Sequence, residues 1–269
     1  MKKVFALVLA LLMLIASLAA CGTAGEQQAA SKLEAVKAAG KLTMATSPDF
    51  PPFESLDPDG NVFGIEVEIM ELICKELGVE LEIKQMSFDS VLPGIQAGKY
   101  DVGVSGISVT PAREKNVLFT APYCLAAQAI VVLEGSEVTG KADLEGKKIA
   151  VQSGTTAETF CMENGYDIAP FAGNSDAQMA LTTGKVAAWV IDDLTAKEMV
   201  DAYNAAAPET QLVILDEAMT TEPYAFAFSM KSEALVAEIN AILVELVKDG
   251  TVAEIFANNN APYTQPELG

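Results

Sequence analysis

The sequence predicts an α/β protein of two successive lobes, in which helices flank largely parallel sheets. Segments patterned as strands alternate with amphipathic helical stripes along most of the chain, which is typical of α/β layers. The alternation starts again in the second half, at residue 148. With 269 residues, 51% of them apolar, the chain is long enough for two lobes of about 100 residues each.

The first lobe begins with a capping box. Ser31 precedes a helix whose third residue is Glu34, and this helix is expected to end near Gly40. Apolar residues spaced as on one helix face predict a second helix, which stops at Gly78. In chain order we expect a strand over 42–46, a helix over 66–77, a strand over 79–83, a helix over 89–98 and a strand over 100–104.

The second lobe repeats this pattern. Its strand over 186–191 is continuously apolar, as expected when helices cover both faces of a sheet. A long helical stripe later in the chain ends at Gly250. The other elements expected are strands over 148–152, 212–215 and 224–230, and helices that start at 155–158 and cover 176–183, 194–202, 233–248 and 251 onward.

Charge and residue usage exclude several classes of function. With 17 Lys and Arg against 37 Asp and Glu, the net charge is −20, and so acidic a chain argues against nucleic-acid binding. The sequence has no histidine, which excludes a Ser-His-Asp or Cys-His hydrolase and a His-ligated zinc site. The glycine motifs of nucleotide-binding folds are missing as well. We therefore expect no catalytic residues, no metal and no cofactor.

The first twenty residues read as an export signal. Lys2 and Lys3 precede a short apolar run, and small residues then lead to Cys21. The stretch Leu18-Ala19-Ala20-Cys21-Gly22 resembles a bacterial lipobox, in which lipid on the Cys21 sulfur anchors the mature protein to a membrane. The alternative is an ordinary signal peptide with an incidental cysteine. Residues 21–30 are small and polar, as in a flexible tether.

The three remaining cysteines cannot all pair within the chain. None forms a Cys-x-x-Cys motif, so a metal or redox site is not expected. Cys74 lies in a helical apolar stripe and reads as a small core residue. A disulfide between Cys124 and Cys161 is the alternative for an exported protein.

Arg113 is the only arginine of the chain, because the other sixteen basic residues are lysines. Thr110 and Pro111 predict a helix start, which places Arg113 in a first turn where the helix dipole disfavours a cation. An anion bound there would relieve this conflict, and a guanidinium fits a carboxylate with two parallel hydrogen bonds. The alternative is a surface arginine paired with Glu114.

Other candidate ligand groups follow predicted strands. Asp192 ends the apolar strand, where ligands bind in open α/β sheets, so it is either a partner for an ammonium group or a helix N-cap. The segment 154–156 opens a helix whose free N–H groups suit an oxyanion. Phe50, Phe53 and Phe88 lie near strand ends, and a pair of them would sandwich a ligand side chain unless they pack in the core.

The order of these motifs resembles a known family. The segments are DFPPFE at 49–54, GIEVE at 64–68, FDSVLP at 88–93, GKYDV at 98–102, SVTPAR at 108–113, FTAPY at 119–123, GTT at 154–156 and Asp192. Together they look like the polar amino-acid solute-binding proteins of ABC importers, solute-binding protein family 3, with the periplasmic binding protein-like II fold. The resemblance covers about Leu33 to Phe256.

This resemblance implies a two-lobed clamp joined by a two-strand hinge, each lobe having a mixed, mostly parallel sheet. Lobe 1 would comprise residues 31–127 and 223–269, and lobe 2 residues 128–222. The implied ligand-binding residues are Arg113, Ser108 and Thr156 for an α-carboxylate, Asp192 and the Gly106 carbonyl for an α-ammonium, Phe50 and Phe88 beside the side chain, and Ser47, Glu54 and Gln152 at its tip. Ser47 stands where some relatives that bind cationic side chains carry an acid.

The implied function is capture of a free amino acid outside the cytoplasm and its delivery to the permease and ATPase subunits of an ABC importer. The protein would be a monomer, held to the cell membrane through Cys21. Burying both charges of a zwitterion requires a partner for each, so ligand would favour closure of the lobes. Two alternatives stay open: a lyase related to the cyclohexadienyl dehydratases, using Glu54 or Asp192, and a ligand-sensing subunit of a membrane receptor.

Overall fold

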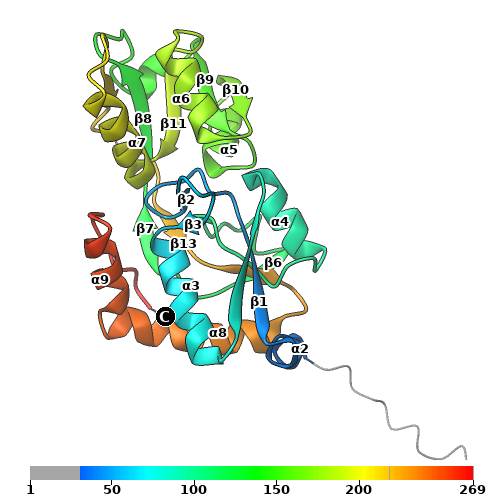
Figure 1. Ribbon diagram of the computed structural model, residues 1–269. Helices are drawn as coiled ribbons and strands as arrows, with labels where there is room; N and C mark the ends of the chain where they lie inside the picture. Colours follow the sequence, from blue (N-terminus) through cyan, green and yellow to red (C-terminus); the bar gives the residue numbers. More distant parts are fainter. Residues whose placement is uncertain (1–30, 218, 269) are drawn as a thin grey trace, which may run out of the picture. The chain divides into compact units, whose positions relative to one another are not determined.

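The computed structural model describes residues 31–268 except residue 218 (Figure 1). The predicted signal at 1–20, the tether at 21–30 and the lipidation site Cys21 lie outside the described residues. Within the described part, two five-stranded sheets each carry helices, and a short two-stranded sheet accompanies the chain between them. We call the first sheet with its helices lobe 1 and the second lobe 2.

Lobe 1 is built on the strand order β4 (Glu80–Gln85), β1 (Lys41–Thr46), β5 (Val102–Gly103), β14 (Ala227–Ser229) and β6 (Val117–Phe119). Its helices are α2 (Lys32–Ala39), α3 (Ile65–Leu77), α4 (Phe88–Gln96), α8 (Glu233–Lys248) and α9 (Thr251–Asn258). The capping box predicted at Ser31 and Glu34 is present. A small hairpin of β2 (Ser55–Leu56) and β3 (Val62–Phe63) follows the β1 loop.

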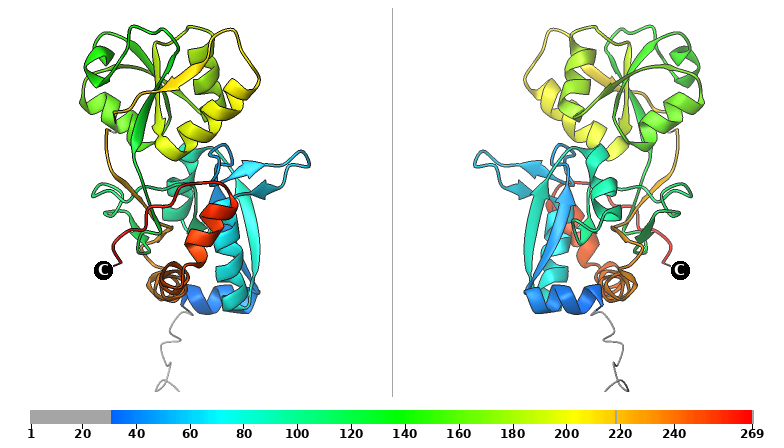
Figure 2. Two further views of the ribbon diagram at one scale, coloured as in Figure 1. Left: turned by 90° about the vertical axis from the view of Figure 1, so that its left-hand side faces the viewer. Right: turned by 90° about the vertical axis from the view of Figure 1, so that its right-hand side faces the viewer.

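Lobe 2 has the strand order β10 (Asp167–Phe171), β9 (Lys148–Gln152), β11 (Ala188–Asp192), β8 (Gln128–Leu133) and β12 (Leu212–Ile214). Its helices are α5 (Thr156–Glu163), α6 (Asn174–Thr182), α7 (Asp193–Ala205) and the 3-10 turn η1 (Lys141–Leu144). Helices pack against the sheets of both lobes (Figure 2). On β11, Trp189 and Ile191 enter one hydrophobic cluster while Ala188 and Val190 enter another, which confirms the prediction of a strand buried on both faces.

The chain passes between the lobes twice, along β7 (Cys124–Ala126) and β13 (Glu222–Tyr224), which pair antiparallel. The strands that follow these passages, β8 and β14, run antiparallel to both of their neighbours. In each sheet the other four strands run in one direction and the returning strand alone is reversed, which confirms the prediction of mixed, mostly parallel sheets. The lobe boundaries at 127/128 and 222/223 stay predictions.

Some elements differ from the predicted ones. The strand expected over 224–230 is divided into β13 and β14, because residues 225 and 226 leave the ladder between the two sheets. Six strands have no counterpart among the strands placed by sequence pattern, namely β2, β3, β6, β7, β8 and β10. Cys74, Cys124 and Cys161 are buried free thiols, so the alternative of a Cys124–Cys161 disulfide is wrong. Burial raises the pKa of Cys74 to about 11 and of Cys161 to about 12.

Candidate functional site

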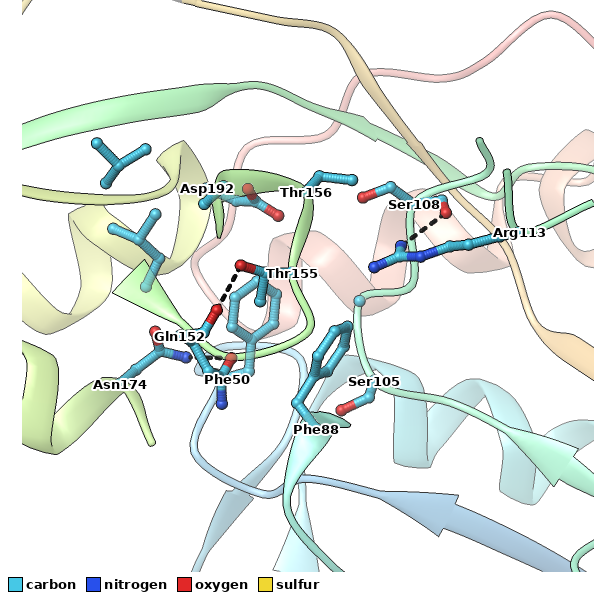
Figure 3. A pocket seen from close by; sticks show the side chains of 14 residues that line it. Phe50, Phe88, Ser105, Ser108, Arg113, Gln152, Thr155, Thr156, Asn174 and Asp192 are labelled. Atoms are coloured by element: carbon cyan, nitrogen blue, oxygen red, sulfur yellow. Dashed lines mark hydrogen bonds between the residues drawn. The ribbon is translucent and has the colours of Figure 1, made fainter. Parts of the chain in front are cut away.

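A pocket lies between the lobes, at the carboxyl ends of β9 and β11 and against loops of lobe 1 (Figure 3). It contains about 370 Å³ of space outside protein atoms, its open mouth included. Most predicted site residues line it, namely Phe50, Phe88, Gly106, Ser108, Arg113, Gln152, Thr156 and Asp192. Thr155 of the candidate segment 154–156 also lines it, and so do five residues that were missed, namely Ser105, Ala157, Asn174, Val190 and Ile191.

Arg113 reaches across from lobe 1 toward lobe 2. Its Nη1 donates to the Ser108 carbonyl at 2.9 Å and its Nη2 to the Gly154 carbonyl at 3.1 Å. The guanidinium carbon also stands 5.7 Å from the centre of the Phe88 ring. Among the described residues no carboxylate lies within 4.0 Å of this cation, so the alternative pairing with Glu114 is wrong. Burial lowers the pKa of Arg113, but a guanidinium stays charged.

The expectation of a helix at Arg113 is wrong. Residues 111–116 form turns that lead directly into β6. Thr110 still acts as a local cap, because its hydroxyl accepts the Arg113 N–H at 3.2 Å. Asn116 and Val117 both donate their N–H groups to the Arg113 carbonyl, which closes the turn. The arginine is thus held by a tight loop, without a helix dipole.

Asp192 lies on the opposite side of the pocket from Arg113 (Figure 3). It occupies the N-cap position of α7, as the alternative expected, but its side chain accepts no hydrogen bond from an N–H of that helix. Its carboxylate instead accepts a hydrogen bond from the Tyr224 hydroxyl of β13. Burial raises the pKa of Asp192 to about 7, and the nearby charge of Glu222 adds to this rise. A bound cation would therefore stabilise the ionised form.

The N-terminus of α5 supplies backbone donors to the same space. Thr155 caps the helix by accepting the Glu158 N–H at 3.1 Å. The Glu158 carboxylate accepts a hydrogen bond from the Gly154 N–H at 2.7 Å. In a standard capping box the donor would be the N–H of the N-cap residue itself, which here is Thr155. In the described part of the chain the N–H of Thr156 has no acceptor, so it is free to bind an anion.

Aromatic rings form one wall of the pocket. Phe50 and Phe88 both line it, whereas Phe53 is fully buried and packs against Phe50 with ring centroids 5.6 Å apart. Of the three phenylalanines, Phe50 and Phe88 are therefore the two that face the pocket. A Cβ on Gly106 would stand 2.4 Å from the Phe50 ring, so glycine at this position leaves room for the ring against the loop.

Ser47 and Glu54 do not line the pocket, so their expected place at the ligand tip is corrected. Both residues are buried, and the Ser47 hydroxyl donates to the Asp49 carboxylate at 3.0 Å. Glu54 is fully buried and accepts the Ser105 hydroxyl at 2.7 Å. Its carboxyl thus supports a residue of the pocket wall from behind.

A second carboxyl supports the same loop. Glu66 is fully buried in α3 and accepts the Gly106 N–H at 2.9 Å and the Tyr123 hydroxyl. Burial raises the pKa of Glu54 well above its usual range, and the charge of Glu66 adds to the effect. The folded protein therefore holds a proton on Glu54 more tightly than the unfolded chain does.

We expect Glu54→Gln to flatten the pH dependence of stability. The pKa of a glutamate in the unfolded chain is about 4.3. The contribution of Glu54 to the free energy of unfolding is therefore greatest below that pH and falls as pH rises toward the pKa in the folded protein. Urea unfolding at pH 5 and pH 8 should show a smaller loss in this variant than in the native protein. Glu71→Gln, on an exposed position of α3, is the control and should keep the native loss. If Glu54→Gln lost as much unfolding free energy between pH 5 and pH 8 as the native protein, a protonated Glu54 would be contradicted.

Gln152 lines the pocket but is not free to bind a ligand tip through its amide. Its Nε2 donates to the Asp49 carboxylate at 3.3 and 3.4 Å and to the Ala172 carbonyl at 3.3 Å. Its Oε1 accepts the Asn174 Nδ2 at 3.1 Å. Asn174 was missed because the strand before it, β10, was not predicted. Ser105 and Tyr224, by contrast, follow predicted strands or begin one, and that position could have indicated them.

Within the described residues, no helix combines the length and apolarity needed to cross a bilayer. The same residues contain no group of three or more Cys, Asp and Glu side chains placed to hold a metal ion.

Comparison with known proteins places the chain in a family. Residues 42–259 match the bacterial extracellular solute-binding proteins, family 3. The chain belongs to this family. This confirms the resemblance and the two-lobed α/β fold that it implied, and members of the family are extracellular proteins that bind solutes.

Relatives and solved structures cover most of the chain. The ABC transporter glutamine-binding protein GlnH of Bacillus subtilis (strain 168) is 30% identical over 269 residues, which cover 95% of this chain and 96% of that protein. The arginine-bound form of truncated ArgBP from T. maritima is 38% identical with a TM-score of 0.73, over 79% of this chain and 99% of that one. The ancestral amino acid-binding protein AncCDT-1, a precursor of cyclohexadienyl dehydratase, is 32% identical with a TM-score of 0.76, over 85% and 99%.

Proposed function

We propose that this family member captures a free α-amino acid between its lobes and delivers it to an ABC importer. The observation that carries the proposal is the placement of Arg113 and Asp192 on opposite sides of one pocket. An α-amino acid has a carboxylate and an ammonium on one carbon, and a buried charge without a partner costs several kcal/mol. A pocket with one cation and one acid, each lacking an ionic partner of its own, suits such a zwitterion.

Each end of the ligand has a set of partners. Arg113 has five N–H donors, two of which reach protein carbonyls, so the others are free to hold the carboxylate. The Thr156 N–H and Ser108 are on the same side of the pocket and add donors. Asp192 and the Gly106 carbonyl would accept the ammonium. Phe50 and Phe88 would flank the ligand side chain.

The ligand would join the two lobes. Arg113 belongs to lobe 1 and Asp192 to lobe 2, so a ligand held by both stabilises the closed arrangement more than the open one. Two of the relatives named above bind glutamine and arginine. Both of these amino acids have extended polar side chains. We therefore expect a polar amino acid, and leave its identity to the screen described below.

Anchoring and partners belong to the same proposal. We expect lipid on Cys21 to anchor the protein to the outer side of the cell membrane. There it would act as a monomer and bind the permease and ATPase assembly of the importer. Globomycin, an inhibitor of lipoprotein signal cleavage, should cause the precursor to accumulate in cells, and Cys21→Ser should release the protein from membranes. Retention of Cys21→Ser on membranes would contradict the anchor.

We also propose binding rather than catalysis. The relationship to a dehydratase precursor raises the alternative of a lyase, which needs an acid and a base at the substrate. Glu54, one candidate, is fully buried behind Ser105, and Asp192, the other, accepts the Tyr224 hydroxyl. Incubation with cyclohexadienyl hydroxy acids and chromatographic detection of products tests the alternative, and any turnover above the Asp192→Asn background would favour the lyase.

A thermal-shift screen of the twenty amino acids tests the main proposal. Ligand that binds only the folded state should raise the free energy of unfolding by about 2.7 kcal/mol at a concentration of 100 Kd. We expect a large rise of the melting temperature with one or a few polar amino acids and none with nucleotides. A flat screen, confirmed by calorimetry at millimolar ligand, would contradict amino-acid binding.

A further inference from the structure

Asp49 joins the lobes at a place next to the pocket but outside its wall. It lies in the loop after β1 of lobe 1, and it is absent from the residues that line the pocket. Its Oδ2 accepts the backbone N–H of Asn174 in lobe 2 at 2.6 Å. This N–H belongs to the first residue of α6, so the carboxylate also meets the positive end of a helix dipole.

Further contacts across the lobes surround this bond. Gln152 of β9 donates to both Asp49 oxygens, at 3.3 and 3.4 Å. The Asn174 Nδ2 lies 3.5 Å from the Asp49 carbonyl oxygen. On the lobe 1 side, Ser47 donates to Asp49 Oδ1 at 3.0 Å and so holds the carboxylate in place. One acidic side chain therefore collects donors from two elements of lobe 2.

Lobe 2 is shaped to admit this carboxylate. Gly173, directly before α6, has an ordinary extended backbone with φ −132°. A Cβ added there would stand 2.9 Å from Asp49 Oδ2. Alanine would thus fit lobe 2 by itself and would collide only with the other lobe. The bare glycine is needed for the contact between lobes and not for the local fold.

We propose that Asp49 is a cross-lobe latch and a positioning residue of the binding site. It stabilises the closed arrangement through protein atoms alone, whatever the ligand, and it fixes the amide of Gln152 in the pocket wall. The Ser47 hydroxyl orients the Asp49 carboxylate through its hydrogen bond, and this gives Ser47 a role other than ligand contact. The inference rests on the two-lobed clamp of the proposed function, and it adds a ligand-independent contribution to closure.

The test compares ligand-free proteins by solution scattering and by hydrogen exchange of residues 105–108 and 152–157. A hydrogen bond to a charged group contributes about 1.5–3 kcal/mol, so Asp49→Ala should shift the closed-to-open ratio toward open by about tenfold or more. We expect a larger radius of gyration and faster exchange in both segments. Gly173→Ala, a change in lobe 2, should raise the radius of gyration and the exchange rates in the same way. Asp49→Asn keeps an acceptor oxygen, so its values should lie between those of the native protein and Asp49→Ala.

Two controls make the test specific. Asp59→Ala removes the same charge from an exposed position of lobe 1 and should behave as the native protein. The double variant Asp49→Ala with Gly173→Ala should add little to either single change, because both remove one contact. Native scattering and exchange in Asp49→Ala, or an equal change in Asp59→Ala, would overturn the latch. Failure of every amino acid in the thermal-shift screen would overturn the proposed function and leave this ligand-free test intact.

Discussion

Replacing Arg113 by alanine should weaken amino-acid binding by on the order of 2–5 kcal/mol. The change removes the only arginine of the chain and with it the cation that faces the pocket. The ligand carboxylate would then be buried between the lobes with only the uncharged donors of Ser108 and Thr156, and most of the loss is the cost of that unpaired charge. Isothermal calorimetry of native and variant protein with the amino acid chosen by the screen measures the effect.

Two comparisons separate the carboxylate role from general damage. Arg113→Lys keeps the charge but loses the bidentate geometry, so its affinity for the amino acid should lie between those of the native protein and Arg113→Ala. The amide of the same amino acid, which has no carboxylate, should bind the native protein weakly and lose little more in Arg113→Ala. Equal affinities of native protein and Arg113→Ala for the free amino acid would contradict the assignment.

Much of the site was predictable because its chemistry is rare or its position is fixed by topology. Arg113 stood out as the only arginine, and Asp192 stood out because it ends a buried strand, where the sheet presents side chains to a ligand. These two arguments need no knowledge of side-chain direction. They placed both charged residues in the pocket although the helix assumed around Arg113 does not form.

The errors have a common physical cause. Ser47, Glu54 and Gln152 lie in segments that approach the pocket, yet their polar atoms bond to protein partners. The Ser47 hydroxyl bonds to nearby Asp49, and the Glu54 and Gln152 side chains bond to residues far along the chain. Sequence patterns locate a loop but do not determine which of its side chains face inward. That choice depends on tertiary hydrogen bonds, such as the one between Glu54 and Ser105, which join residues 51 positions apart.

The reversed strand of each sheet was not identified in advance for a similar reason. A strand's own sequence indicates burial, and β8 and β14 are largely buried, as a sheet strand of either direction would be. Their direction follows from where the chain enters the sheet after passing between the lobes. Helix ends with local signals, such as the left-handed Gly78 after α3, were by contrast predicted within a residue.

Amino-acid affinity should fall in acid because of Asp192. Burial raises its pKa to about 7 in the ligand-free protein, whereas an ammonium ligand favours the carboxylate. Binding at lower pH must therefore displace a proton from Asp192, and the Kd should rise by up to tenfold for each pH unit below about 7. Calorimetry between pH 5 and pH 8, in buffers of different ionisation enthalpy, should show this slope together with proton release on binding.

The same carboxyl should make stability depend on pH in the opposite sense. Without ligand, the folded state holds the Asp192 proton to about pH 7 and the unfolded chain only to about pH 3.9. The free energy of unfolding should therefore fall as pH rises through this range, and a saturating ligand should offset the loss above pH 7. Unfolding curves with and without ligand at pH 5 and pH 8 measure the difference.

Asp192→Asn isolates this effect from the other acids near the pocket. Glu222, Asp193 and Tyr224 stay in place, so any pH dependence that they cause persists. The variant should bind the amino acid more weakly than native protein above pH 7, with a Kd that hardly changes down to pH 5. The deaminated analogue, which has no ammonium, should bind both proteins alike at pH 8. A native slope in Asp192→Asn, or an equal loss for both ligands, would mean that another group receives the ammonium.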